Sequence, residues 1–133
     1  MRYLLDSDWI INLLAGKKDA QDKIQRIDPH EIGISLITVA EIYESAYHFA
    51  NPDAHIEKFR TFLKNFHLVD LNLPIMETFA QIRAHLRRRG EIIPDFDILL
   101  AATALHYGLV IVTNNRRHFE RIPDLKIYEW HSS

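Results

Sequence analysis

The sequence predicts an α/β fold in which helices cover both faces of a central, mostly parallel sheet. Short apolar runs alternate with longer segments of helical spacing, which is typical of parallel strands joined by helices. The run over residues 109–112 is apolar throughout, as expected for a strand buried on both faces. Because the chain has 133 residues and no long linker, we expect one domain over residues 1–133.

The first half of the chain is expected to form two strand–helix units. Asp6 and Ser7 follow an apolar run and can cap a helix that begins near Trp9. Gly16 and Pro29 are helix breakers and mark the ends of the next segments. The expected elements are a strand over 2–5, a helix over 9–16, a helix over 19–27, a strand over 32–35 and a helix over 38–49, which Asn51-Pro52 ends.

The second half is expected to repeat this alternation. Pro74 fits the first turn of a helix that ends in Arg87-Arg88-Arg89 and Gly90, where cations suit the helix dipole. The expected elements are a helix with apolar residues 56, 59, 63 and 66, a strand over 68–71, a helix over 74–90, a buried helix over 97–107, a central strand over 109–112, a short helical turn holding His118 and Phe119, and a last strand over 126–130.

The composition favours a cytoplasmic protein without disulfides. The chain has no cysteine, which excludes a disulfide scaffold and a thiolate metal site. We expect neither a signal peptide nor a membrane span, because acids come early and no uncharged apolar run is long enough. The formal net charge is −2, so a polyanionic substrate would need local cations, for which the arginine run is the candidate.

Four acids are predicted to meet at one edge of the sheet. Asp6 directly follows the first strand, Glu41 lies shortly after the second, and Asp95 and Asp97 begin the buried helix. In open sheets of this kind, ligands bind beyond the carboxyl ends of the strands. Converging carboxylates repel one another unless a cation lies between them, and their hard oxygen atoms suit Mg²⁺ or Mn²⁺. The pattern therefore predicts an acidic, metal-dependent site.

Each acid taken alone also fits a structural role. Asp6 and Asp95 stand where helix N-caps are expected, and Asp97 complements a helix dipole. Thr38 and Glu41 have the spacing of a capping box. When Glu41 is considered by itself, a capping role is as well supported as a metal-binding role. The coincidence of all four acids at one predicted edge favours the metal site.

The other familiar catalytic patterns are missing from the sequence. The eight histidines have no metal-site spacing, and we interpret them as surface or satisfied side chains. No serine stands in a nucleophile elbow, and four dispersed glycines are too few for a phosphate-binding loop. These absences leave the acids as the candidate site.

Four blocks of sequence, in order, resemble the PIN-domain ribonucleases, specifically the VapC toxins of type II toxin–antitoxin systems. Any one block is weakly specific, whereas four in the family's order are quite specific and extend over nearly the whole chain. The blocks are residues 3–8 (YLLDSD), 35–43 (SLITVAEIY), 93–104 (IPDFDILLAATA) and 112–119 (VTNNRRHF).

The resemblance implies a PIN-like three-layer α/β/α domain that acts as a metal-dependent endoribonuclease. Mg²⁺, or Mn²⁺ in its place, would activate a water that hydrolyses RNA phosphodiesters. It implies Asp6, Glu41 and Asp97 as catalytic residues, with Asp6 and Asp97 as direct metal ligands. It also implies a homodimer and a small cognate antitoxin.

Supporting roles in the site are expected for Asp95, Thr113, Asn114 and Asn115. Many family members carry a fourth acid where this chain has Asn115. This departure weakens the expectation of a second, tightly held ion. Thr113 and Asn114 are expected to position a substrate phosphate or a metal-bound water.

Two other functions fit parts of the sequence. Residues 3–8 also match the apolar run and Asp-x-Asp of a haloacid-dehalogenase-like phosphatase, with Asp6 as nucleophile and Asp8 as acid. That mechanism needs a late acid pair, where this chain has Asn114 and Asn115. The other alternative is a catalytically degenerate PIN-like binding module, which the asparagine at 115 leaves open.

Overall fold

The computed structural model describes residues 1–130 and contains a parallel sheet with strand order β3-β2-β1-β4. In register, Tyr3 lies opposite Ile32 and Val110, and Ile34 lies opposite Leu68. The strands are β1 (Tyr3–Leu5), β2 (Ile32–Ser35), β3 (His67–Val69) and β4 (Val110–Val112). One of the eight histidines, His131, lies outside the described residues.

Helices connect all of these strands. They are α1 (Ser7–Leu14), α2 (Lys18–Ile24), the 3₁₀ turn η1 (Pro29–Glu31), α3 (Leu36–Ala46), α4 (Pro52–Leu63), α5 (Leu73–Arg88), α6 (Asp95–Tyr107) and α7 (Arg116–Phe119). None of the helices in the described part is long and apolar enough to cross a membrane.

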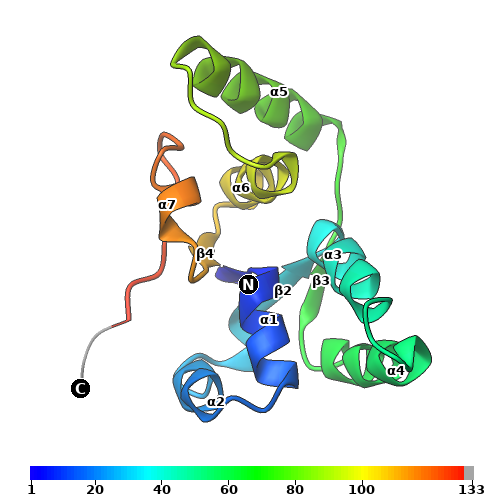
Figure 1. The fold of residues 1–133 in the computed structure, drawn as a ribbon. Coiled ribbons are helices and arrows are strands. Elements are labelled where there is room, and N and C mark those ends of the chain that lie inside the picture. Colours follow the sequence, from blue (N-terminus) through cyan, green and yellow to red (C-terminus); the bar gives the residue numbers. More distant parts are fainter. Residues whose placement is uncertain (131–133) are drawn as a thin grey trace.

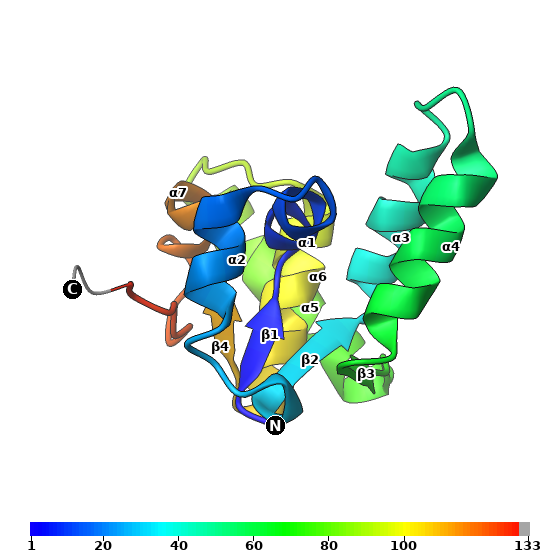
Figure 2. The same ribbon diagram turned by 90° about the horizontal axis from the view of Figure 1, so that it is seen from below.

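The predicted three-layer α/β/α fold is confirmed. Successive residues of β1 face opposite sides of the sheet, as the strand pleat requires. Leu4 packs in a core beneath α5, α6 and α7, and Leu5 packs in a second core beneath α1 to α4. Figures 1 and 2 show these two groups of helices on opposite sides of the strands. Each core is apolar because both faces of the sheet are covered.

Helix starts place acids at the carboxyl edge of the sheet. Asp6 is the N-cap of α1, and Ser35 is the N-cap of α3, where its Oγ accepts from the Ile37 N–H at 3.1 Å. The capping-box interpretation of Thr38 and Glu41 is therefore wrong, because α3 begins at residue 36 and Thr38 is fully buried. The N-cap interpretation of Asp95 is also wrong, because Pro94 precedes the helix and α6 begins at Asp95.

Two strand predictions need correction. The strand at 109–112 is buried but lies at the edge of the sheet, because β1 and β2 occupy the centre. The expected last strand over 126–130 is reduced to a single parallel bridge between Ile127 and Ile111. Aromatic contacts hold this segment instead. Tyr128 packs edge-on against Tyr3, with ring centroids 5.4 Å apart, and the ring centroids of Trp130 and Trp9 are 5.0 Å apart.

Candidate functional site

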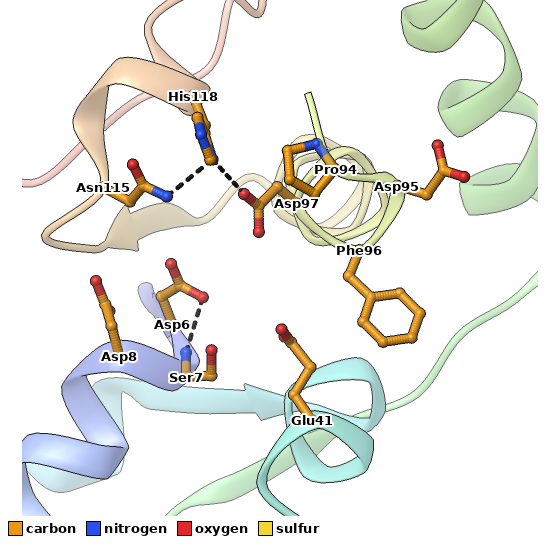
Figure 3. A pocket seen from close by; sticks show the side chains of 10 residues that line it. All are labelled: Asp6, Ser7, Asp8, Glu41, Pro94, Asp95, Phe96, Asp97, Asn115 and His118. Atoms are coloured by element: carbon orange, nitrogen blue, oxygen red, sulfur yellow. Dashed lines mark hydrogen bonds and ion pairs between the residues drawn. The ribbon is translucent and has the colours of Figure 1, made fainter. Parts of the chain in front are cut away.

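A hollow of about 460 Å³ opens at the carboxyl edge of the sheet, beside the starts of α1, α6 and α7. Figure 3 shows the side chains around it, which come from α1, α3, α6 and α7 and from residues just before three of these helices. The lining residues are Asp6, Ser7, Asp8, Glu41, Pro94, Asp95, Phe96, Asp97, Asn115 and His118. Within the described chain this lining includes five carboxylates and neither lysine nor arginine, so the hollow is strongly acidic.

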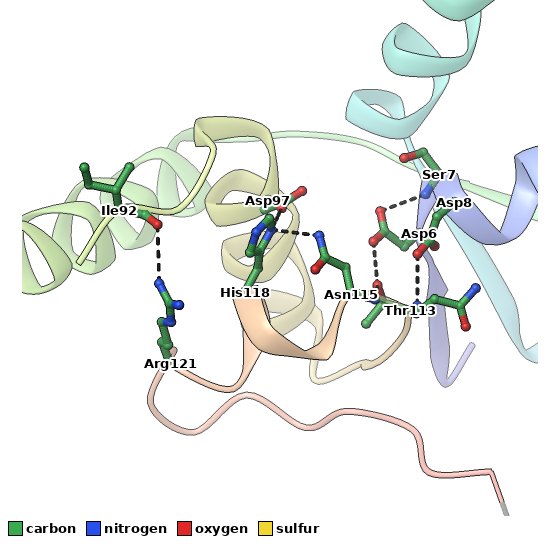
Figure 4. Close-up of polar contacts among 10 residues, drawn as sticks. Asp6, Ser7, Asp8, Ile92, Asp97, Thr113, Asn115, His118 and Arg121 are labelled. Carbon is green, nitrogen blue, oxygen red and sulfur yellow. Dashed lines mark hydrogen bonds and ion pairs between the residues drawn. The ribbon is translucent and has the colours of Figure 1, made fainter.

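Asp6 is almost fully buried, with 5% of its surface exposed. Its Oδ1 accepts from the Ser7 N–H at 2.7 Å, so the predicted capping role is real. Its Oδ2 accepts from Thr113 Oγ1 at 2.7 Å, which ties the end of β1 to the end of β4 (Figure 4). Burial raises the pKa of Asp6 to about 6, and the charges of Asp8 and Asp97 add to the rise.

Asp97 faces Asp6 from the first turn of α6 (Figure 3). Its Oδ2 lies 2.6 Å from Nδ1 of His118, and Asn115 Nδ2 lies 2.8 Å from the same ring nitrogen. A single Nδ1 hydrogen cannot satisfy a carboxylate and also leave a lone pair for an amide N–H. Asp97 Oδ2 is the closer partner and accepts the Nδ1–H hydrogen, so in this tautomer the Asn115 amide nitrogen contacts Nδ1 without donating to it.

His118 corrects our interpretation of the histidines as surface or satisfied side chains unrelated to a site. Its side chain is only 32% exposed and lines the hollow. The fully buried Phe119 anchors α7 in the core beneath α6, and this packing directs the neighbouring His118 towards Asp97. The sequence did not indicate that His118 lies beside Asp97, because only tertiary packing brings α7 next to α6.

Glu41 projects into the hollow from α3 (Figure 3). Burial raises its pKa to about 7, and the charges of Asp6, Asp97 and Asp8 add to the rise. The three carboxylates selected from sequence therefore line one hollow, and the charges of Asp6 and Asp97 both act on Glu41.

Asp8 is a further acid of the hollow that our predicted metal site omitted. Its Oδ2 accepts from the Asn114 N–H at 3.0 Å, and its Oδ1 is buried with no hydrogen-bond partner in the described part of the chain. Burial raises the pKa of Asp8, the Asn114 hydrogen bond lowers it, and the charge of Asp97 raises it. The spacing of Asp6 and Asp8, two residues apart directly after the first strand, is the sequence pattern that could have identified Asp8 as a site residue.

The remaining supporting candidates lie around the hollow in different ways. Asp95 lines it, but its Oδ1 accepts from Arg83 Nε at 2.9 Å on the side away from Asp6. Thr113 and Asn114 lie behind the hollow, where they hold Asp6 and Asp8 as described above. Asn115 lines the hollow and contacts His118.

The donor set fits a hard divalent cation. Carboxylate oxygens are the preferred ligands of Mg²⁺ and Mn²⁺, and the partnerless, buried Asp8 Oδ1 is an acceptor that an ion or its water could satisfy. No three acidic or histidine side chains in the described part of the chain are grouped closely enough to hold an ion. Their mutual repulsion and their existing partners, His118 on Asp97 and Thr113 on Asp6, explain why they line the hollow without converging further.

Comparisons with known proteins point to one family. The PIN domain family model matches residues 3–125. Ribonuclease VapC2 of Haemophilus influenzae is 31% identical over 132 residues, and this covers 98% of each chain. The tRNA(fMet)-specific endonuclease VapC of Salmonella typhimurium is 29% identical over 130 residues, again with 98% of each chain covered.

Solved structures agree with the sequence comparisons. The crystal structure of DNA-bound VapBC from Salmonella typhimurium matches with a TM-score of 0.88 at 28% identity, covering 98% of this chain and 99% of that one. The crystal structure of VapBC2 from Rickettsia felis also has a TM-score of 0.88, at 24% identity, and supports the fold alone. The region that the family model matches, residues 3–125, contains every residue that lines the acidic hollow.

Proposed function

The chain belongs to the PIN-domain family, and we propose that it is the endoribonuclease toxin of a toxin–antitoxin pair, which hydrolyses RNA at the acidic hollow. The observation that carries the proposal is the meeting of Asp6, Glu41 and Asp97, from three separate elements, in one hollow. The similarity to ribonucleases named VapC supports the same reaction. The alternative of a haloacid-dehalogenase-like phosphatase is wrong, because the family is a different one.

We propose Mg²⁺, with Mn²⁺ able to replace it, as the cation of the site. When bound, such an ion supplies charge neutralisation at the phosphoryl oxygens and makes water a better nucleophile. Asp6 and Asp97 would hold it through their carboxylates. Asp8 would contribute its unpartnered Oδ1, either directly or through a water.

Glu41 is proposed as the group that takes the proton of the attacking water. In the metal-free protein, burial and the neighbouring carboxylates raise the pKa of Glu41 to about 7, and a carboxylate with a raised pKa is a stronger base. Because water is the nucleophile, the products should carry a 5′-phosphate and a 3′-hydroxyl. Thr113 and Ser7 fix the Asp6 carboxylate while this happens.

The proposed partners are an RNA substrate, a cognate antitoxin and a second copy of the chain. The solved structural relatives include a toxin–antitoxin complex from Klebsiella pneumoniae, which supports the antitoxin. Large apolar side chains remain exposed on the surface, as expected for a subunit contact. They include Leu73 at 77% exposure, Tyr47 at 68% and Leu68 at 55%.

The proposal is tested by incubating the purified protein with tRNA(fMet), which a 29% identical relative is named for, and with total tRNA. Cleavage should need Mg²⁺ or Mn²⁺ and stop with EDTA, and Asp97→Ala should abolish it while circular dichroism shows an unchanged fold. Full metal-dependent cleavage by Asp97→Ala would show that the site is elsewhere. Metal binding without cleavage of any RNA would favour the degenerate binding module.

His118 is proposed to position Asp97. Replacing it by alanine removes the 2.6 Å contact to Asp97 Oδ2 and should weaken Mn²⁺ binding about tenfold, because partners of metal ligands typically contribute that much. His118→Asn should keep most of the affinity, since the asparagine amide nitrogen stands at the place of Nδ1. Titration calorimetry measures both variants. Equal Mn²⁺ affinities for His118→Ala and the wild type would contradict this role.

A further inference from the structure

A second hollow, of about 520 Å³, lies between the end of α5, the loop that follows it and the start of α6. It shares Pro94 and Asp95 with the acidic hollow, so the two hollows adjoin across these residues. We call it the arginine groove, and its lining residues are Arg83, Leu86, Arg87, Gly90, Glu91, Ile92, Ile93, Pro94, Asp95 and Ile98. Unlike its neighbour, it contains cations.

The neighbouring arginines at the end of α5 differ in their contacts. Arg87 faces the arginine groove and has no ion-pair or hydrogen-bond partner among the described residues. Arg89 is taken by Glu91, with Nε 3.3 Å from Oε1. A helix end of this kind is usually only solvated, but here an unpaired guanidinium lines a groove that leads to a reactive site.

Two further arginines border the same region. Arg83 pairs with Asp95 at the boundary between the two hollows, and both side chains are largely exposed, at 42% and 61%. Exposed ion pairs contribute little free energy, so another anion can replace Asp95 as the partner of Arg83 at little cost. Arg121 reaches the Ile92 carbonyl at 3.4 Å from the α7 side (Figure 4). Cations therefore gather around the α5–α6 loop in a chain whose net charge is −2.

We propose that the arginine groove binds the phosphate backbone of an unpaired RNA strand next to the phosphodiester that is cut in the acidic hollow. The inference rests on the proposed function. The carboxylates of the acidic hollow repel phosphates, so affinity for RNA has to come from cations beside it. Arg87 is the free phosphate contact, and Arg83 exchanges Asp95 for a second phosphate as the strand enters.

Apolar side chains on the rim favour an RNA strand over an isolated phosphate. Ile92 is 88% exposed, and Phe96, which lines the acidic hollow beside the shared Pro94, is 51% exposed. A base can stack on the Phe96 ring without sequence preference, and Ile92 extends the apolar surface beside it. The groove thus supplies charge for the backbone and an apolar surface for a base, directly beside the acids.

The test is fluorescence anisotropy of a short, labelled single-stranded RNA with the metal-free protein in EDTA, where no cleavage occurs. Arg87→Ala should weaken binding about fivefold to tenfold and lower the slope of log K against log salt by about one, as for a lost phosphate contact. Arg87→Lys should retain most of the affinity. The matched control is Arg60→Ala, an exposed arginine on α4 that lines neither hollow, which should bind like the wild type.

The outcomes separate this inference from the proposed function. If the wild type cleaves RNA and Arg87→Ala binds and cleaves RNA equally well, the groove inference is overturned and the nuclease stands. If Arg87→Ala lowers RNA affinity but no RNA is cut with Mg²⁺ or Mn²⁺, the groove stands and the nuclease fails. Weaker binding of an acidic partner protein by Arg87→Ala, with RNA binding unchanged, also overturns the groove inference.

Discussion

Replacing Asp6 by asparagine is expected to abolish RNA cleavage and, at the same time, to stabilise the metal-free protein at pH 8. The rate should fall about a thousandfold or more, because a neutral amide binds the cation more weakly and supplies no negative charge to place it for the phosphodiester chemistry. Stability should rise, because a buried carboxylate with a pKa raised to about 6 is ionised at pH 8 against an unfavourable environment.

The gain in stability is expected to be about 3 kcal/mol, from a pKa raised by about two units. Asparagine is as good an N-cap as aspartate, so the contact to the Ser7 N–H is kept. Its amide nitrogen can donate to Thr113 Oγ1, which can accept as well as donate. Urea unfolding in EDTA measures the change. An active Asp6→Asn variant, or one that is less stable than the wild type at pH 8, would contradict this prediction.

The second large effect is a loss of metal-free stability as pH rises. Asp6 and Glu41 have folded pKa values of about 6 and about 7, above their ordinary values of 3.8 and 4.5. Between about pH 4 and pH 7 the folded state therefore holds more protons than the unfolded state, so the free energy of unfolding falls with rising pH. The loss of unfolding free energy from Asp6 and Glu41 is absent below about pH 4 and complete above about pH 7.

A double variant isolates this effect from all other titrating groups. Asp6→Asn with Glu41→Gln should unfold like the wild type near pH 4 and be more stable by about 3–6 kcal/mol at pH 8 in EDTA. Saturating Mn²⁺ should raise the melting temperature of the wild type at pH 8 and much less at pH 5, where protons compete for the carboxylates. A gap between the two proteins that stays constant from pH 4 to pH 8 would refute the raised pKa values.

Much of the fold was predictable from sequence because local signals agreed with the final packing. The apolar runs became β1, β2 and β4, and Gly108, in the left-handed conformation, ends α6 as the pattern indicates. The last strand was predicted wrongly, because residues 126–130 have the composition of a strand, whereas only Ile127 forms a bridge and the aromatic rings of Tyr128 and Trp130 pack on Tyr3 and Trp9.

The candidate site was predictable only where chain order encodes it. Asp6 and Asp97 stand at the junctions of strands, loops and helix starts, so topology alone brings them to one edge. His118 depends on the docking of α7 through Phe119, which no spacing reveals. Arg87 and Arg89 are near neighbours with the same chemistry, and only the folded chain shows that one is paired and the other faces a groove.

The most direct test of the central claim, that Asp6 and Asp97 bind one divalent cation, is calorimetric titration of metal-free protein with Mn²⁺ at pH 8. Asp95→Asn is the matched control, because Asp95 lines the same hollow but its carboxylate is held by Arg83. We predict that Asp6→Asn and Asp97→Asn each weaken Mn²⁺ binding at least about tenfold, while Asp95→Asn binds like the wild type. Undiminished binding by Asp6→Asn and Asp97→Asn would contradict the account.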